Sequence, residues 1–333
     1  MGLCHMVATV NPLPGVPLID NPFFDRLVSS LPSDVQRIAR ALHDNGYAVI
    51  DFPDDKFEEL SSSIRSRYAP RADELDAWRL KGKDLRSLDC WPSDPEVRRI
   101  ASNAKIMRLL EQLYGKRAVP FQTLVFPVGS QQRAHSDAAH FDSSPQGFMC
   151  GVWLALEDID YDNGPLIYYP GSHRWPHFSN EHLGINAWHL PSRLAHGDDY
   201  ERLWQDMIDL YGAKPERFTA KKGQAILWHA RLLHGGDKQH DQTRTRFSQV
   251  THYFFEGCAY YTPFYSDPFY GNIFFRHPVN IATGEPIENF VSGRKVPSWF
   301  IVQAKYHGPI GATKHTLSRW KQSLLGARRG QGA

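Results

Sequence analysis

Two residues of metal-binding type lie two positions apart in the middle of the chain, at His135 and Asp137. If this segment is a strand, both side chains point to the same face, because strand side chains alternate with a period of two. An imidazole and a carboxylate on one face supply two of the three ligands of a facial metal site. His234, which stands directly before the glycine pair 235–236, is the candidate for the third ligand.

Each of these candidates has a competitor nearby. His140 and Asp142 repeat the His-x-Asp spacing, and His229 lies a few residues before His234. A His-x-Asp pair is a weak signal on its own, because many such pairs are ordinary surface residues. At the level of residue pattern, both pairs and both downstream histidines therefore stay open.

The composition indicates a globular protein rather than one that binds nucleic acid or a membrane. The 333 residues are 41% hydrophobic, which is ample for a core, and the formal net charge of +2 gives no electrostatic case for nucleic acid or an anionic membrane. No run of 18 apolar residues exists, and the N-terminus lacks the pattern of a signal peptide. The four cysteines are scattered without a C-x-x-C pair, so we expect reduced thiols in a cytoplasmic protein.

Helical periodicity dominates the first third of the chain, and strand patterns dominate the middle. Helices are predicted over 34–45, with Ser33 as N-cap, over 55–67 and over 95–114. The predicted strands are 47–52, 119–128, 133–137, 148–156, 166–169, 218–221, 224–229 and 246–255. Short strands separated by turn signals favour a sandwich or jelly roll.

We expect a single domain over 1–333, mainly β with flanking helices. It would consist of an N-terminal helical region over 1–117, a jelly-roll core over 118–256 and a C-terminal extension over 257–333 that ends in a helix near 314–325. An insertion over 175–217, with one helix near 198–211, interrupts the core. An insertion of that length between two core strands is a candidate lid.

Several segments of the predicted core resemble the phytanoyl-CoA dioxygenase family of Fe(II)/2-oxoglutarate-dependent oxygenases. The matching segments are His135-Ser-Asp137, Trp153-Leu-Ala-Leu-Glu-Asp-Ile159, Asn163-Gly-Pro-Leu-Ile-Tyr-Tyr-Pro-Gly-Ser-His-Arg174, Lys222-Lys-Gly-Gln-Ala-Ile-Leu-Trp-His229, Leu233-His-Gly-Gly236 and Thr245-Arg-Phe-Ser248. They follow the family's order over about 118–255. The resemblance implies a double-stranded β-helix barrel of the jelly-roll or cupin type, with Fe(II), 2-oxoglutarate and O2 as cofactors and cosubstrates.

The resemblance also implies which residues hold the iron. It places the metal ligands at His135, Asp137 and His234, since the distance from the first pair to the Trp153 strand suits the family. The Leu-His-Gly pattern likewise favours His234 over His229.

The distal carboxylate of 2-oxoglutarate needs a buried cation, and arginine suits it because its planar fork matches both oxygens and stays charged. Arg246 and Ser248 face the same way on a strand, so we predict that they bind this carboxylate together. Arg244 is expected to be a solvated turn residue. Gln122 and Trp153 match family positions that contact the cosubstrate.

The substrate side is predicted only from proximity along the sequence. His140, Phe141 and Arg231 lie near the ligands and are the candidates for contacts to a small-molecule substrate. An acidic residue at Asp137 disfavours halogenation, because related halogenases carry a small residue there. The resemblance then implies hydroxylation coupled to conversion of 2-oxoglutarate to succinate and CO2. Desaturation or cyclisation, or a jelly-roll protein that binds metal or ligand without redox chemistry, are the alternatives.

Overall fold

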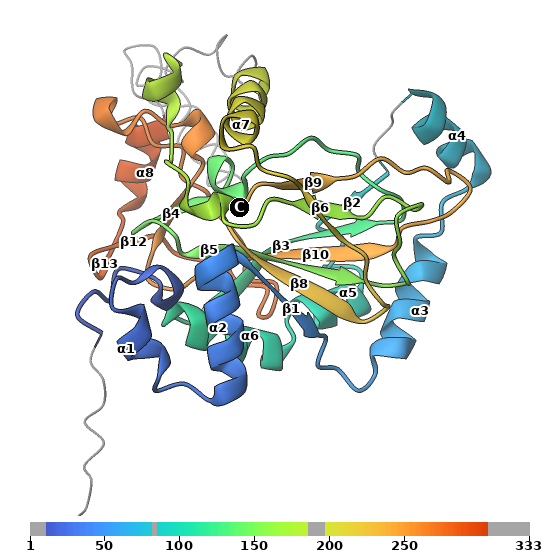
Figure 1. Ribbon diagram of the computed structural model, residues 1–333. Coiled ribbons are helices and arrows are strands. Elements are labelled where there is room, and N and C mark those ends of the chain that lie inside the picture. Colours follow the sequence, from blue (N-terminus) through green and yellow to red (C-terminus); the bar gives the residue numbers. More distant parts are fainter. Residues whose placement is uncertain (1–10, 82–84, 186–196, 306–333) are drawn as a thin grey trace, which may run out of the picture.

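Two antiparallel sheets face each other at the centre of the computed structural model, which describes residues 11–81, 85–185 and 197–305 (Figure 1). The larger sheet has the strand order β1-β8-β5-β10-β3-β2, and the smaller has the order β7-β6-β9. Their bounds are β1 Tyr47–Asp51, β2 Ser87–Leu88, β3 Ala118–Phe126, β5 Met149–Ala155, β6 Leu166–Tyr168, β7 Glu216–Phe218, β8 Gln224–His229, β9 His234–Gly236 and β10 Ser248–Phe255.

The larger sheet is buried on both faces, and its side chains alternate between two cores. Along β5, Val152 and Leu154 pack with the helices, whereas Trp153 and Ala155 pack with residues of the smaller sheet. Every residue of β5 is buried. A strand covered on both sides reads as a continuous apolar run, which is why the pattern over 148–156 predicts it well.

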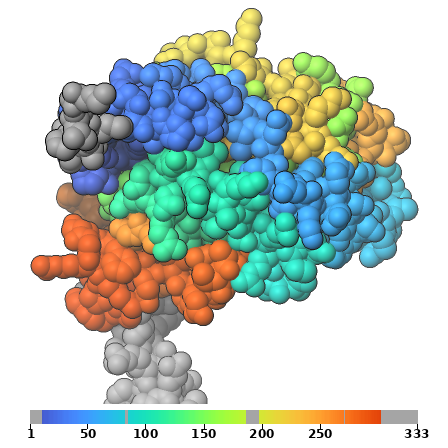
Figure 2. All heavy atoms as spheres, turned by 90° about the horizontal axis from the view of Figure 1, so that it is seen from below, coloured from blue at the N-terminus to red at the C-terminus, as the bar shows by residue number. Residues whose placement is uncertain are grey.

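Helices of the first third of the chain cover the outer face of this sheet (Figure 1), and residues of that third make up much of the surface seen from below (Figure 2). The helices of the described residues are α1 Phe24–Val28, α2 Ser33–Asn45, α3 Phe57–Arg67, α4 Ala72–Lys81, α5 Pro95–Ala101, α6 Ala104–Tyr114, α7 Gly197–Tyr211 and α8 Ser298–Lys305. None of them is long and apolar enough to cross a membrane. The predicted helix over 314–325 and part of the insertion, 186–196, lie outside the described residues.

Two predictions about the helix ends are wrong. The N-cap of α2 is Pro32, and Ser33 is instead the first helical residue, without a capping hydrogen bond from its side chain. The helix predicted over 95–114 is two helices, because Asn103 turns out of the helical path and accepts hydrogen bonds from the amides of Lys105 and Ile106. The apolar periodicity continues through this break and concealed it.

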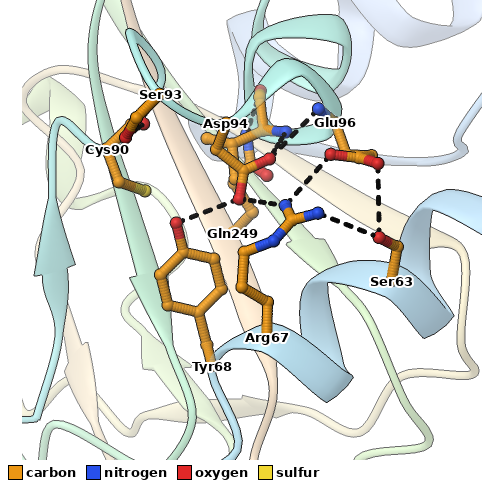
Figure 3. A network of polar contacts seen from close by, with 9 residues as sticks. Ser63, Arg67, Tyr68, Cys90, Ser93, Asp94, Glu96 and Gln249 are labelled. Atoms are coloured by element: carbon orange, nitrogen blue, oxygen red, sulfur yellow. Dashed lines mark hydrogen bonds and ion pairs between the residues drawn. The ribbon is translucent and has the colours of Figure 1, made fainter.

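A polar network ties α3 to the start of α5 (Figure 3). Asp94 is the N-cap of α5, and its Oδ1 accepts hydrogen bonds from the amides of Glu96 and Val97. Its Oδ2 accepts from Arg67 and from the hydroxyl of Tyr68. Because Asp94 is almost fully buried, these partners compensate the desolvation of its charge. The network holds α3 and α5 together within the helical layer.

The strand predicted over 133–137 is wrong. His135 makes one isolated bridge to His234, and a 3-10 turn begins at Asp137. The remaining strands form two small two-stranded antiparallel sheets, β4 Asp142–Ser144 with β11 Ala259–Tyr261 and β12 Phe290–Val291 with β13 Arg294–Lys295. Within the described residues, no pairing between the two central sheets closes them into a barrel.

Candidate active site

The backbones of His135 and His234 are joined by reciprocal hydrogen bonds at one end of the smaller sheet. The His135 amide donates to the His234 carbonyl over 2.9 Å, and the reverse bond spans 3.0 Å. The glycine pair after His234 permits this approach: a Cβ on Gly235 would lie 2.6 Å from the carbonyl oxygen of Gln132, and one on Gly236 would meet the neighbouring backbone at 2.8 Å. The pair brings two distant histidines side by side, with ring centroids 4.4 Å apart.

Local backbone contacts fix the orientation of both imidazoles. Nδ1 of His135 lies 2.9 Å from the carbonyl oxygen of Arg133, and Nδ1 of His234 lies 3.0 Å from that of Leu232. An Nδ1 proton donated to a carbonyl leaves Nε2 with a free lone pair. Both Nε2 atoms lie 3.8 Å from Asp137, at Oδ1 for His135 and at Oδ2 for His234. The ligand atoms of the three residues lie within 4.8 Å of one another.

The protonation states suit a metal-binding cluster. Burial, reinforced by His234, lowers the pKa of His135 to about 4, so this imidazole is neutral at neutral pH. Burial alone would raise the pKa of Asp137, but His234, His252 and His135 together hold it well below its ordinary value. The cluster therefore presents a carboxylate and an imidazole whose lone pair is available.

The competing residues do not belong to the cluster. His229 contacts Asp20 over 3.0 Å and connects the sheet to the N-terminal segment. Asp142 accepts from the amide of Ser143, and burial raises its pKa to about 6. The cluster that could hold a metal, among the described residues, contains neither of these nor His140.

Arg246 is buried in the same region and is only partly paired. Its side chain is 2% exposed, and Nη1 donates to Oγ of Ser248 over 2.8 Å. Its Nε has no hydrogen-bond partner, and no described carboxylate lies within ion-pair distance. Burial lowers the pKa of Arg246 to about 10. Arg244, by contrast, pairs with Asp160 near the surface, as expected of a turn residue.

A pocket of about 330 Å³ connects Arg246 with the histidine cluster. Trp153 lines this pocket, and Cζ of Arg246 lies over its ring, 5.6 Å from the ring centroid of Trp153. Gln122 also lines it, with Oε1 3.1 Å from Nδ1 of His252. The predicted substrate residues His140 and Phe141 line the same pocket.

Arg231, predicted to contact the substrate, lies outside this pocket. It lines a separate small cavity beside Trp175 and His177, and its guanidinium contacts Gln146. The chain turns between Arg231 and His234, so closeness in sequence does not bring Arg231 into the pocket. The helix of the insertion does approach the site, since the ring of Trp204 in α7 lies 6.5 Å from that of His135.

Two pocket residues escaped the reasoning from sequence. Trp228 donates from Nε1 to Oδ2 of Asp137 over 2.8 Å, and Nε2 of His252 lies 3.4 Å from the same oxygen. A signal for His252 existed, because it lies at an even offset from Arg246 and Ser248 along one strand and so faces the same side. Trp228 reads as ordinary core in the apolar run of β8.

The residues present fit Fe(II) and 2-oxoglutarate. Two imidazoles whose Nδ1 atoms face backbone carbonyls, together with one carboxylate, are the donor set of a facial triad with open positions. The unpartnered Nε of Arg246, buried in the same pocket, fits an anionic group.

Comparisons with known proteins agree with this chemistry. A family profile described as Phytanoyl-CoA dioxygenase (PhyH) matches residues 42–246, more than half of the chain. Phytanoyl-CoA dioxygenase domain-containing protein 1 of Danio rerio is 28% identical over 146 residues, 42% of this chain and 47% of the relative. The peroxisomal phytanoyl-CoA dioxygenase of Bos taurus is 24% identical over 172 residues, 48% of this chain and 47% of the relative. The chain spans about half the length of these curated relatives.

A solved structure supports the fold. The non-heme alpha ketoglutarate dependent carbocyclase SnoK from nogalamycin biosynthesis superimposes with a TM-score of 0.52 at 15% identity, over 79% of this chain and 95% of that chain. The region matched by the family profile contains His135, Asp137, His234 and Arg246. The chain therefore belongs to the phytanoyl-CoA dioxygenase family of Fe(II)- and 2-oxoglutarate-dependent oxygenases.

Proposed function

We propose that this protein is a dioxygenase that hydroxylates a small-molecule substrate while 2-oxoglutarate is converted to succinate and CO2. One observation carries the proposal: a single pocket joins a three-residue metal-binding cluster to a buried arginine that lacks an anionic partner. A protein that only bound metal would have no use for the arginine, since burying an unpaired charge costs free energy.

His135, Asp137 and His234 are the proposed iron ligands. The bound iron would supply the oxidation chemistry, in which O2 is consumed, 2-oxoglutarate loses CO2 and the substrate gains an oxygen atom. The protein holds both imidazoles in the tautomer that offers Nε2, through their contacts with backbone carbonyls. The pKa of Asp137 is held well below its ordinary value, so this carboxylate is ionised at neutral pH.

Arg246 and Ser248 are the proposed partners of the distal carboxylate of 2-oxoglutarate. Their side chains already contact each other, so little ordering is needed on binding. Trp153 walls this end of the pocket and helps to exclude water. Gln122 is the proposed amide contact: its Oε1 is engaged with His252, which leaves the amide nitrogen for the cosubstrate.

His140 and Phe141 are the proposed substrate contacts, since both line the pocket that reaches the cluster. The volume of about 330 Å³ suits a small molecule, given that 2-oxoglutarate shares it. The facing sheets support the further proposal that the core, 118–256, is a double-stranded β-helix within a single domain. Helix α7 of the insertion over 175–217 would cover the site, because the ring of Trp204 lies close to that of His135.

Product analysis tests this function. Purified protein with Fe(II), 2-oxoglutarate and a panel of small molecules in an ¹⁸O2 atmosphere should release succinate, and an accepted substrate should gain one labelled oxygen atom. A product that loses two hydrogens without gaining oxygen would replace hydroxylation with desaturation or cyclisation. Absence of succinate from folded, iron-loaded protein, with and without the panel, would contradict the proposal.

A further inference from the structure

The carboxylate of Asp137 has two oxygens in different surroundings. Oδ2 accepts a hydrogen bond of 2.8 Å from the indole Nε1 of Trp228, and Nε2 of His252 lies 3.4 Å away. Oδ1 has no hydrogen bond from any described side chain, and lies 3.8 Å from Nε2 of His135. Each oxygen therefore lies 3.8 Å from Nε2 of one histidine of the cluster, but only Oδ2 accepts a hydrogen bond from the indole.

The indole reaches Oδ2 because of a glycine on the neighbouring strand. Trp228 in β8 lies opposite Gly151 in β5. A Cβ on Gly151 would lie 2.7 Å from Nε1 of the indole and still closer to Cε2 and Cζ2. No real Cβ tolerates such contacts, so only glycine lets the indole lie over the strand at this point. The ring is almost fully buried, with 2% exposure, and its centroid lies 4.7 Å from that of His234.

An indole N–H is well suited to this position. It donates one hydrogen bond, accepts none and does not titrate near neutral pH, so it does not bind the metal and its protonation state does not change. Its hydrogen bond to a carboxylate is charge-assisted and buried, which makes it stronger than one between neutral groups. Such partners of a metal ligand fix the ligand's orientation and basicity.

We propose that Trp228 is a positioning residue that holds Oδ2 of Asp137 and thereby offers Oδ1 alone to the iron, with Gly151 providing the space for the indole. The inference rests on the proposed function. If Asp137 bound the iron in a bidentate manner, it would take a further coordination position. A chelating cosubstrate and O2 together need all three positions that a facial triad leaves open. The Trp228–Gly151 pair would keep those positions free.

Trp228→Phe tests the proposal, because it removes the donor and keeps an aromatic ring. We expect Fe(II) affinity, measured by anaerobic titration without cosubstrate, to fall about 10- to 100-fold, the usual range for losing an outer partner of a metal ligand. The visible charge-transfer band of the Fe(II)–2-oxoglutarate complex should also shift or weaken. Trp78→Phe is the matched control, since Trp78 is 5% exposed in α4, outside the pocket. It should leave affinity and band unchanged.

Gly151→Ala provides an independent test that keeps the donor. The added methyl must displace the indole, so Fe(II) affinity should fall as it does in Trp228→Phe. The smaller phenyl ring should accept the methyl more easily, so the second substitution should cost less in the double variant than alone. Thermal unfolding of the metal-free variants checks that each is folded, and if one fails to fold the other decides.

Wild-type affinity and an unchanged band in folded Trp228→Phe, or in folded Gly151→Ala, would overturn the proposal. The failure of the proposed function looks different. In that case the wild-type protein itself would show no charge-transfer band with Fe(II) and 2-oxoglutarate.

Discussion

Replacing Arg246 with methionine should affect the stability of the protein and its binding of 2-oxoglutarate in opposite directions. The arginine is 2% exposed, its Nε has no partner, and Ser248 is its hydrogen-bond partner among the described side chains. Methionine fills similar space without charge. The substitution should remove a buried cation that costs stability in the absence of cosubstrate, and should also remove the group that binds the cosubstrate.

The size of the stability change follows from the pKa of Arg246, which burial lowers to about 10. One pKa unit corresponds to about 1.4 kcal/mol, so the charged form costs the folded state about 3 kcal/mol. For a base whose pKa falls on folding, this cost is present at every pH below the folded value, and so at pH 7. Loss of the Ser248 bond and of the ring contacts with Trp153 and Phe126 removes about 1–2 kcal/mol. The cosubstrate-free variant should therefore match the wild type or exceed it by about 1–2 kcal/mol.

With 2-oxoglutarate bound, the wild type should become the more stable of the two proteins. At 100 times its Kd, 2-oxoglutarate should stabilise the Fe(II)-loaded wild type by about 2.7 kcal/mol. Losing a buried charged partner costs about 2–5 kcal/mol of binding, so the variant should bind 2-oxoglutarate at least about 30-fold more weakly. Anaerobic urea unfolding at several 2-oxoglutarate concentrations measures both effects.

Arg244→Met is the matched control, because Arg244 pairs with Asp160 near the surface and should change neither quantity by more than about 1 kcal/mol. The reasoning would be refuted if Arg246→Met were several kcal/mol less stable without cosubstrate. It would also be refuted if 2-oxoglutarate stabilised that variant as strongly as the wild type.

Three further predictions concern residues outside the pocket. Burial raises the pKa of Asp142 to about 6, so the stabilising contribution of its protonated form is present below about pH 4 and is lost as the pH rises to about 6. The unfolding free energy of Asp142→Asn, relative to that of the wild type, should therefore rise by up to about 3 kcal/mol between pH 4 and pH 7. A difference between the two proteins that does not change with pH would contradict this. Asp94→Ala removes the α5 cap and the partner of Arg67, and should cost about 2–4 kcal/mol in urea unfolding, with Asp94→Asn recovering part of it; an effect under 0.5 kcal/mol would disprove the network's role. His229→Ala should keep wild-type Fe(II) affinity in an anaerobic titration, because His229 contacts Asp20 rather than the cluster; weakened binding would argue against this placement.

The buried strands were predictable because their pattern is simple. The predictions over 148–156, 224–229 and 246–255 lie within two residues of β5, β8 and β10. Each strand is covered on both faces or alternates between two cores, and the chain shows this directly as apolar runs.

The convergence of His135 and Asp137 was predicted from a premise that proved wrong. The segment is no strand, because the carbonyl of Asp137 accepts hydrogen bonds from the amides of His140 and Phe141 and so starts a turn. The two side chains meet because His135 pairs with the backbone of His234, across a contact that the glycine pair allows. The Leu-His-Gly pattern was thus more informative than the two-residue spacing.

Other features depend on contacts that no local pattern reveals. Trp228 lies in an apolar strand, and its hydrogen bond to Asp137 follows only once β8 and the turn at Asp137 are brought together. The absence of a side chain at Gly151 has meaning only opposite that indole. Arg231 lies outside the pocket for the converse reason, since closeness along the chain does not fix the direction in which a side chain points.

One spectrum tests the central claim most directly. Anaerobic protein mixed with Fe(II) and 2-oxoglutarate should develop a weak visible metal-to-ligand charge-transfer band. His135→Ala and Asp137→Ala should lose this band while remaining folded, because each removes one member of the cluster whose ligand atoms lie within 4.8 Å of one another. A folded, iron-loaded wild-type protein without the band, or a band that survives both substitutions, would contradict the assignment of this site.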